Sequence, residues 1–219
     1  MDQQVILMIA EGVRDTLYMT VVSTLFGYII GLPWGIVLTV TGKEGIHPNA
    51  GIYRVLDVIT NIMRSIPFLI LLILVIPLTR IIVGKSYGST ATIVPLVISA
   101  APFIARMVES SLNEVDHGVI EAAQSMGASN MSIIIKVLLG EARVSLVSGA
   151  TITISTILGY SAMAGTVGGG GLGDIAIRYG YYRYQADILF VTVILLILLV
   201  QIFQIIGTFI SVKIDKRRV

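Results

Sequence analysis

Five apolar runs, each long enough to cross a lipid bilayer as a helix, dominate the sequence. An α-helix rises about 1.5 Å per residue, so roughly 20 apolar residues cross a hydrocarbon core of about 30 Å. Backbone groups inside lipid must be hydrogen-bonded within the protein, and helices achieve this segment by segment. We therefore predict an all-α integral membrane protein with five transmembrane helices in a single domain, residues 1–219. The predicted spans are residues 17–40, 65–83, 91–107, 146–167 and 186–212.

The composition supports this class and excludes several others. Charged residues make up 13% of the chain and hydrophobic residues 55%, whereas soluble domains carry about 25% charged residues. The chain has no cysteine, which excludes disulfides, thiol catalysis and thiolate metal sites. Its two histidines, His47 and His117, lie in predicted loops, so we expect no buried histidine metal site. A net charge of +2 is too small to indicate nucleic-acid binding.

The N-terminal residues include acidic side chains and do not match the basic start of a cleaved signal peptide. We therefore expect the first apolar run to remain as a span. Residues 3–10 are predicted to form a short amphipathic helix on the membrane surface before it. Residues 51–63, with Arg54 and Asp57, are predicted to form an interfacial helix that leads into the second span. Pro67 marks the start of that span, because Pro is tolerated in the first turn of a helix.

Two spans carry residues that indicate close packing inside a helix bundle. Gly27, Gly31 and Gly35 recur every four residues in the first span and place a smooth strip on one face. Such a strip lets a neighbouring helix approach closely, although glycine is also simply tolerated in membrane helices. Pro95 and Pro102 interrupt the third span. We expect that span to face the bundle interior, where freed backbone groups find partners.

A mostly polar segment, residues 116–141, lies between the third and fourth spans (DHGVIEAAQSMGASNMSIIIKVLLGE). Asp116 can cap a short helix by accepting a backbone hydrogen bond. Gly127 can end that helix, because glycine tolerates the left-handed backbone conformation. Ser129 can cap a second helix that starts at Asn130. The segment is too polar to cross a bilayer, so we expect two helices outside the lipid that present one face to a partner.

The same segment resembles the EAA loop of permease subunits of ABC importers. The matching residues are Glu121, Ala122, Ala123, Gly127, Val137, Leu138 and Leu139. In that family the loop is the coupling element that lies in a groove of a cytoplasmic ATPase. The resemblance implies this ATPase-coupling role for Glu121, Ala122, Ala123 and Gly127, and we call residues 116–141 the coupling segment. Where this chain has Val137, the family usually has Ile, and this difference keeps an apolar contact. Where this chain has Gly140, the family usually has Pro, and without that proline we expect the entry into the next helix to be less rigid.

The whole chain resembles the permease subunits of methionine ABC importers. The matching segments are residues 31–41, 61–72, 93–112, 121–129 and 159–173. The resemblance implies a type I ABC importer permease fold, with five transmembrane helices and cytoplasmic coupling helices between spans 3 and 4. It also implies a homodimer in the bacterial inner membrane, two cytoplasmic ABC ATPase subunits that hold ATP and Mg²⁺, and an extracytoplasmic substrate-binding lipoprotein. Methionine, as either enantiomer or a derivative, is the implied cargo. The chain itself is expected to bind no cofactor and to catalyse no reaction.

Basic residues near the ends of the predicted spans orient the chain, because they mark the cytoplasmic side of a membrane. One side holds Lys43, Arg54, Arg64, Arg106, Lys136, Arg143, Lys213, Lys216, Arg217 and Arg218. The other side holds Arg14, Arg80, Lys85, Arg178 and Arg183. This distribution predicts an external N-terminus and a cytoplasmic C-terminus. It also places the coupling segment in the cytoplasm, where an ATPase can reach it.

The fourth span is rich in Ser, Thr, Gly and Ala, which suits tight packing or lining a pathway better than contact with lipid. Tyr160, Ser161 and Met163 lie near its outer end and are candidate pathway or gate residues. A flexible methionine suits a narrow gate, and ordinary helix packing is the alternative. The glycine-rich residues 168–184 are expected to fold over the outer mouth, with their tyrosines in an interfacial belt.

Other function classes fit the sequence less well. The glycines at 165–173 are not a phosphate-binding loop, because no Gly-Lys-Ser/Thr follows them. An intramembrane serine hydrolase has candidate nucleophiles in Ser155 and Ser161 but no histidine base in any predicted span. A stand-alone ion-coupled carrier usually needs ionisable groups inside the membrane, and the predicted spans hold no Asp or Glu except Asp187, at one edge. An importer permease for another small amino acid or a short peptide remains the alternative within transport.

Overall fold

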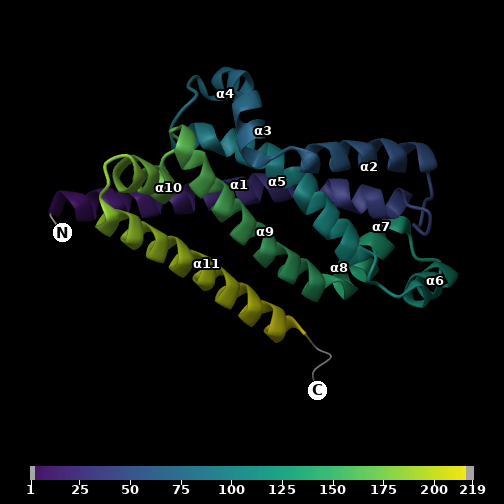
Figure 1. Ribbon diagram of the computed structural model, residues 1–219. Coiled ribbons are helices and arrows are strands. Elements are labelled where there is room, and N and C mark those ends of the chain that lie inside the picture. The colour runs from purple at the N-terminus through teal and green to yellow at the C-terminus, as the bar shows by residue number, and fades with distance from the viewer. Residues whose placement is uncertain (1–2, 216–219) are drawn as a thin grey trace.

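The computed structural model describes residues 3–215, and every regular element in that range is a helix (Figure 1). Four helical stretches are long and apolar enough to cross a membrane, or five if the bent pair α2–α3 is one span. The longer helices are α1 (Gln3–Thr41), α2 (Ala50–Ser65), α5 (Ser89–Leu112), α9 (Arg143–Ala164) and α11 (Ala186–Ile214). The shorter elements are α3 (Phe68–Leu74), α4 (Ile76–Val83), α6 (His117–Ser125), α7 (Asn130–Ser132), η1 (Ile133–Leu138), α8 (Leu139–Glu141), η2 (Gly165–Val167), α10 (Gly171–Ile175) and η3 (Ala176–Tyr181). The all-α class is confirmed for this range. The predicted basic tail residues Lys216, Arg217 and Arg218 lie outside it.

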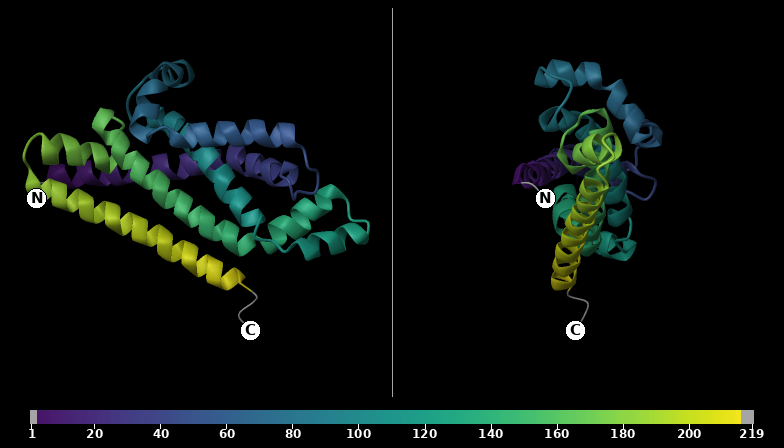
Figure 2. Two further views of the ribbon diagram at one scale, coloured as in Figure 1. Left: turned by 45° about the vertical axis from the view of Figure 1, so that its right-hand side comes forward. Right: turned by 60° about the vertical axis from the view of Figure 1, so that its left-hand side comes forward.

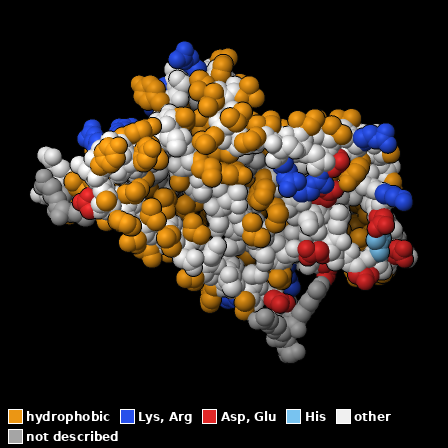
Figure 3. All heavy atoms as spheres, viewed as in Figure 1, with side chains coloured by type: hydrophobic (Ala, Val, Ile, Leu, Met, Phe, Trp, Pro, Cys, Tyr) orange, Lys and Arg blue, Asp and Glu red, His pale blue; other side chains and the backbone are white. Residues whose placement is uncertain are grey.

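The helices form an elongated bundle with different structures at its two ends (Figures 1 and 2). At one end, α10 and η3 lie beside the start of α1. At the other end lie α6, α7 and α8, and the C-terminal end of α11 points toward that end as well. The acidic side chains and the visible histidine gather mainly over the α6–α8 end, whereas hydrophobic side chains cover much of the bundle (Figure 3). The coupling segment is therefore at the charged end of the molecule.

The N-terminal part of α1 is not a separate surface helix. The structure has one continuous helix of 39 residues from Gln3 to Thr41, so the predicted break between residues 3–10 and the first span is wrong. Ile9 and Gly12 are buried in this region. A Cβ added to Gly12 would meet Ile175 and Leu172, so this face packs against α10. The N-terminal turns of α1 are held by tertiary contacts that periodicity in residues 3–10 does not reveal.

The glycine strip of α1 is the surface on which α5 packs. A Cβ added to Gly31 would lie 2.6 Å from the carbonyl oxygen of Ala101, and one added to Gly35 would lie 2.6 Å from that of Ala105. Gly27 approaches Ala100 and Ile104 in the same way. The close-packing interpretation of the strip is confirmed. Pro95 and Pro102 are buried in α5, which stays helical through both.

The predicted second span, residues 65–83, is not one helix. The chain bends by 101° between α2 and α3, and α3 and α4 are separated by Val75. Pro67 is the cause of the first break, because a residue before proline avoids the helical region and Ile66 is extended (φ −79°, ψ 122°). A second proline, Pro77, stands in the first turn of α4, where its missing N–H is not needed. The apolar run at 65–83 is long enough for one span, but Pro67 and Pro77 accompany its division into the separate helices α3 and α4.

Helix α2 directs Tyr53, Asp57 and Asn61 toward α5, and many of its apolar residues face outward. Arg106 on α5 pairs with Asp57 (Nη2–Oδ1 2.5 Å) and with Glu109 (Nη1–Oε2 2.6 Å). Its Nη2 also donates to Asn61 Oδ1 (3.0 Å), and Tyr53 Oη donates to Glu109 Oε1 (3.2 Å). The exposed apolar side chains of α2 are Ile52, Val55, Val58, Ile59 and Ile62. The predicted interfacial helix at 51–63 is therefore a helix with its polar contacts toward the bundle and an exposed apolar face, which suits an apolar environment outside the bundle.

The glycine-rich residues after α9 form a tight corner. Here α10 packs against α9 and α1, η2 packs against α9, and η3 packs against α11. Gly168, Gly170 and Gly171 all have positive φ. Thr16 Oγ1 on α1 accepts a hydrogen bond from the backbone N–H of Leu172 (2.9 Å). Thr92 Oγ1 on α5 donates to the carbonyl oxygen of Gly169 (3.2 Å). The corner is thereby attached to both α1 and α5.

Candidate coupling and gate sites

The first helix of the coupling segment begins and ends as the sequence predicts. Asp116 precedes α6, and its Oδ1 accepts a hydrogen bond from the N–H of Gly118 (2.7 Å). At the other end, Gly127 has φ +76°, the left-handed conformation that favours glycine. The N–H of Ala128 donates to the carbonyl oxygen of Ala123 (3.0 Å), which closes the last turn. Both predicted helix signals are confirmed.

The second half of the coupling segment is less regular than predicted. Ser129 does act as a cap, and its Oγ accepts a hydrogen bond from the N–H of Ser132 (3.3 Å). The chain then runs through α7, the π-helix η1 and α8, and continues after Ala142 into α9. The predicted fourth span started at residue 146, whereas α9 starts at Arg143. The absence of proline at Gly140 is consistent with this nearly uninterrupted passage from coupling segment to span.

The four residues assigned to coupling divide between two faces of the segment. Glu121, Ala122 and Gly127 are exposed, whereas Ala123 is buried with 6% of its surface accessible. Ile120 is buried beside it, and both belong to the core cluster that also contains Ile133 and Leu138. One face of α6 therefore anchors the helix in the bundle, and the opposite face is free to contact a partner.

Exposed apolar side chains extend the free face of the coupling segment. Met126 is 81% exposed and Met131 64%, on the two sides of Gly127. Val119 and Ile135 are exposed as well. Apolar side chains of this size standing in water are typical of interaction surfaces, and methionine adapts well to a partner's shape. The sequence reasoning missed these residues, although two methionines within a polar segment were the available signal.

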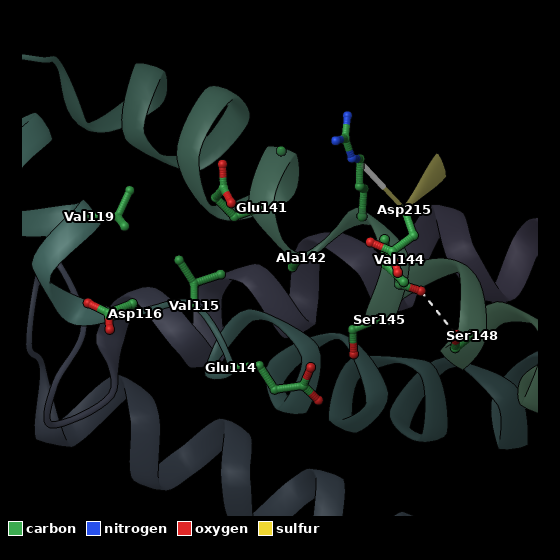
Figure 4. Close-up of a pocket in the computed structure, with 12 residues that line it drawn as sticks. Glu114, Val115, Asp116, Val119, Glu141, Ala142, Val144, Ser145, Ser148 and Asp215 are labelled. Atoms are coloured by element: carbon green, nitrogen blue, oxygen red, sulfur yellow. Dashed lines mark hydrogen bonds between the residues drawn. The ribbon is translucent and has the colours of Figure 1, made fainter. Parts of the chain in front are cut away.

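A cavity of about 600 Å³ lies between the coupling segment, the start of α9 and the end of α11 (Figure 4). Glu114, Asp116, Glu141 and Asp215 supply carboxylates to its wall, and Arg143 supplies a guanidinium. Ser148 Oγ donates to the carbonyl oxygen of Val144 (3.0 Å) within the same wall. Residues of the coupling segment, the start of α9 and the end of α11 therefore face one shared hollow.

The three candidate gate residues have different surroundings. Tyr160 stacks on Phe68 of α3, with ring centroids 4.6 Å apart and an angle of 2° between the ring planes. Ser161 is buried, and its Oγ donates to the carbonyl oxygen of Leu158 (2.7 Å). Met163 is 48% exposed. Met163 therefore has the freedom to line a path, whereas Tyr160 connects α9 to the broken second apolar run and Ser161 is engaged inside α9.

The chain is similar in sequence to transport permease proteins of bacteria. The chain is 52% identical over 203 residues to the probable D-methionine transport system permease protein MetI of Vibrio cholerae, covering 93% of this chain and 90% of that protein. It is 54% identical over 165 residues to the D-methionine transport system permease protein MetI of Escherichia coli K12, covering 75% of this chain and 76% of that protein.

Solved structures give the same result for the fold. A chain of the inward-facing MetNI methionine ABC transporter matches with a TM-score of 0.97 and 50% identity, over 99% of this chain and 100% of that one. An amino acid ABC transporter matches with a TM-score of 0.77 at 19% identity, which shows the fold alone. The model of the family described as binding-protein-dependent transport system inner membrane component matches residues 31–218. The chain belongs to this family of inner-membrane transport components and has the type I ABC permease fold.

Proposed function

We propose that this chain is the membrane permease subunit of an ATP-driven importer that carries methionine. The observation that carries the proposal is the match of nearly the whole chain to the MetNI permease, together with a coupling segment whose caps and hinge are intact. The relatives named above are D-methionine permeases, so both enantiomers are candidate cargoes. An importer of another small amino acid is the alternative, since the fold is shared with such a transporter at low identity.

The proposed assembly has two copies of the chain, two cytoplasmic ATPase subunits and an extracytoplasmic binding lipoprotein. Helix α11 supports the pairing of two copies or broad lipid contact, because 11% of its most apolar stretch is buried within one chain. Two copies about a twofold axis can enclose a polar path that a single bundle of this size cannot. ATP and Mg²⁺ belong to the ATPase in this assembly, and the permease chain holds no cofactor.

In the proposed cycle, ATP brings the two ATPases together, and their surfaces carry the coupling segments with them. The exposed side of α6, with Glu121 and Ala122, supplies the contact. Because the buried side of α6 is anchored through Ala123 and Ile120, displacement of the segment reaches the bundle. The spans then change from inward-open to outward-open, and Met163 on α9 narrows the path between these states.

We infer five spans, with the bent pair α2–α3 as the second and α4 at the outer side, which moves Arg64, near the end of α2, away from the cytoplasmic side. The basic residues support an external N-terminus and a cytoplasmic C-terminus. Helix α2 has 16 residues, about 24 Å at the usual helical rise, which is short for a span on its own. The bent pair α2–α3 passes the length and apolarity test together.

Cysteine labelling tests both orientation and gate, because the native chain has no cysteine. In cells, Ser86→Cys should react with a membrane-impermeant thiol reagent, and Glu121→Cys should react only after the membrane is permeabilised. Met163→Cys should react from outside when ATP and vanadate trap the complex, and at least about tenfold more slowly without nucleotide. If Glu121→Cys reacted in intact cells, the chain would have the opposite orientation in the membrane. If Met163→Cys reacted at the same rate with and without nucleotide, Met163 would not be part of the gate.

The function itself is tested with the permease and its ATPase reconstituted in proteoliposomes. The binding protein is added with L-methionine, D-methionine, histidine or alanine, and ATP hydrolysis and uptake are measured. We expect one or both methionine enantiomers to stimulate hydrolysis and to accumulate inside. Stimulation by another amino acid, with none by methionine, would instead support the alternative importer.

A further inference from the structure

The loop between α1 and α2, residues 42–49, reaches both halves of the coupling segment. Both histidines of the chain lie at this junction. The His47 ring nitrogen Nε2 is in hydrogen-bond contact with the side-chain amide of Asn130, the first residue of α7. Glu44 faces His117, the first residue of α6, with Oε2 3.7 Å from Nε2. One loop therefore touches the start of the helix before Gly127 and the start of the helix after it.

This loop is held firmly to the helices on either side of it. The N–H of His47 donates to the carbonyl oxygen of Val40 (3.0 Å), and that of Asn49 donates to the carbonyl oxygen of Thr41 (2.9 Å). The Asn49 side chain caps α2 by accepting from the N–H groups of Gly51 and Ile52, both at 3.1 Å. A displacement of the loop must therefore displace the end of α1 and the start of α2.

Side chains rather than continuous packing join the loop to α6. A cavity of about 260 Å³ lies between them, and Glu44, His117, Ile120 and Glu109 are among its lining residues. Ile46 does pack against the core from the loop side. The contacts of Glu44 and His47 thus bridge a partly hollow junction.

We propose that residues 42–49 act as a brace that makes α1 and α2 move with the coupling segment. This proposal rests on the proposed function, because it takes the coupling segment as the part that an ATPase moves. The chain itself connects the coupling segment directly to α5 and α9. The brace connects α1 and α2 to the coupling segment at the same end of the bundle. A displacement of the coupling segment would then move α1, α2, α5 and α9 together. Glu44 and His47 are positioning residues in this role, since they hold the segment without being part of its exposed apolar face.

The test changes the brace and leaves the coupling segment intact. In the ATPase complex, Glu44→Ala with His47→Ala should lower methionine uptake per ATP hydrolysed by about fivefold, with normal co-purification of the ATPase. Lys43→Ala is the matched control, because it removes a charged side chain from the same loop and should keep the wild-type ratio. A wild-type ratio in the double variant would overturn the brace.

A reversible cross-link gives a second, independent measurement. The chain with His47→Cys and Asn130→Cys should show a low uptake-to-hydrolysis ratio, and a short bis-methanethiosulfonate linker between the two thiols should raise it. Reductant should lower it again. A cross-link that blocks uptake would overturn the proposal, because it would mean that loop and coupling segment must separate. If instead the wild type shows no ATP-driven methionine uptake in the same vesicles, it is the proposed function that fails.

Discussion

Replacing both Gly31 and Gly35 by valine should strongly reduce the amount of folded permease. At each position the first added atom would fall within 2.6 Å of a backbone carbonyl oxygen of α5, and within 2.7 Å of the Cβ of Ile104 or Val108. Neither obstacle can rotate away, so α1 and α5 must separate along their shared face. Overpacking costs about 1–3 kcal/mol per site. The two sites together should therefore cost about 2–6 kcal/mol, a large part of a stability of roughly 5–15 kcal/mol.

The measurement is the yield of monodisperse permease after detergent extraction, with thermal unfolding of whatever remains. Gly159→Val is the matched control. It introduces the same side chain into a helix of similar character, but nothing lies within 4 Å of an added Cβ there in the single chain. We expect the control to fold with near-normal yield. A double variant with wild-type yield and unfolding temperature would mean that α1 and α5 do not pack through these glycines.

Replacing Gly127 by valine should leave the permease folded and inserted but largely uncouple it from its ATPase. The residue has φ +76°, and nothing lies within 4 Å of an added Cβ, so backbone strain is the whole effect. That strain is about 1–2 kcal/mol, too little to unfold the chain but enough to change the angle between α6 and the residues after it. Because Met126 and Met131 stand on opposite sides of this hinge, a changed angle disrupts one continuous contact face.

Uptake and hydrolysis in proteoliposomes, with co-purification of the ATPase, measure this effect. Uptake should fall by about tenfold or more, through weaker docking or through hydrolysis without transport. Gly140→Val is the control, because it also adds a side chain to the coupling segment in open space but at a helical residue. Glu121→Ala should act in the same direction as Gly127→Val by removing an exposed charge from the docking face. Full uptake in both Gly127→Val and Glu121→Ala would leave the segment without a coupling role.

Features that depend on a few consecutive residues, such as helix caps and turns, could be predicted from the sequence. Features that depend on which other helix lies beside a given helix could not. Asp116 and Gly127 were identified correctly because a cap and a left-handed turn are properties of a few consecutive residues. The glycine strip was identified because its spacing matches one helix face. The predicted helix that carries Glu121, Ala122 and Ala123 is present as α6, although which of these residues face outward required the structure.

Helix α2 shows why the second apolar run was harder to predict than the first. Periodicity in residues 51–63 reveals one polar and one apolar face, but it does not reveal which of the two faces inward. Asp57 and Asn61 have their partner in Arg106, which is distant in the sequence. In water the polar face of a helix is outward, whereas here it is the inner one. Pro67 was read as the start of a helix, and the structure shows that it is also the end of the preceding one.

The glycine corner after α9 limits which of its own positions can be redesigned. At Gly165 and Gly173 an added side chain would meet the backbone of the facing segment, so no choice of neighbouring residues makes room for it. An engineer who wishes to admit a bulkier cargo therefore has no freedom at those positions. The exposed positions of the corner are Thr166, whose Oγ1 donates to the carbonyl oxygen of Met163 (2.8 Å), and Val167. Libraries aimed at new cargo should vary these two residues and leave the glycines unchanged.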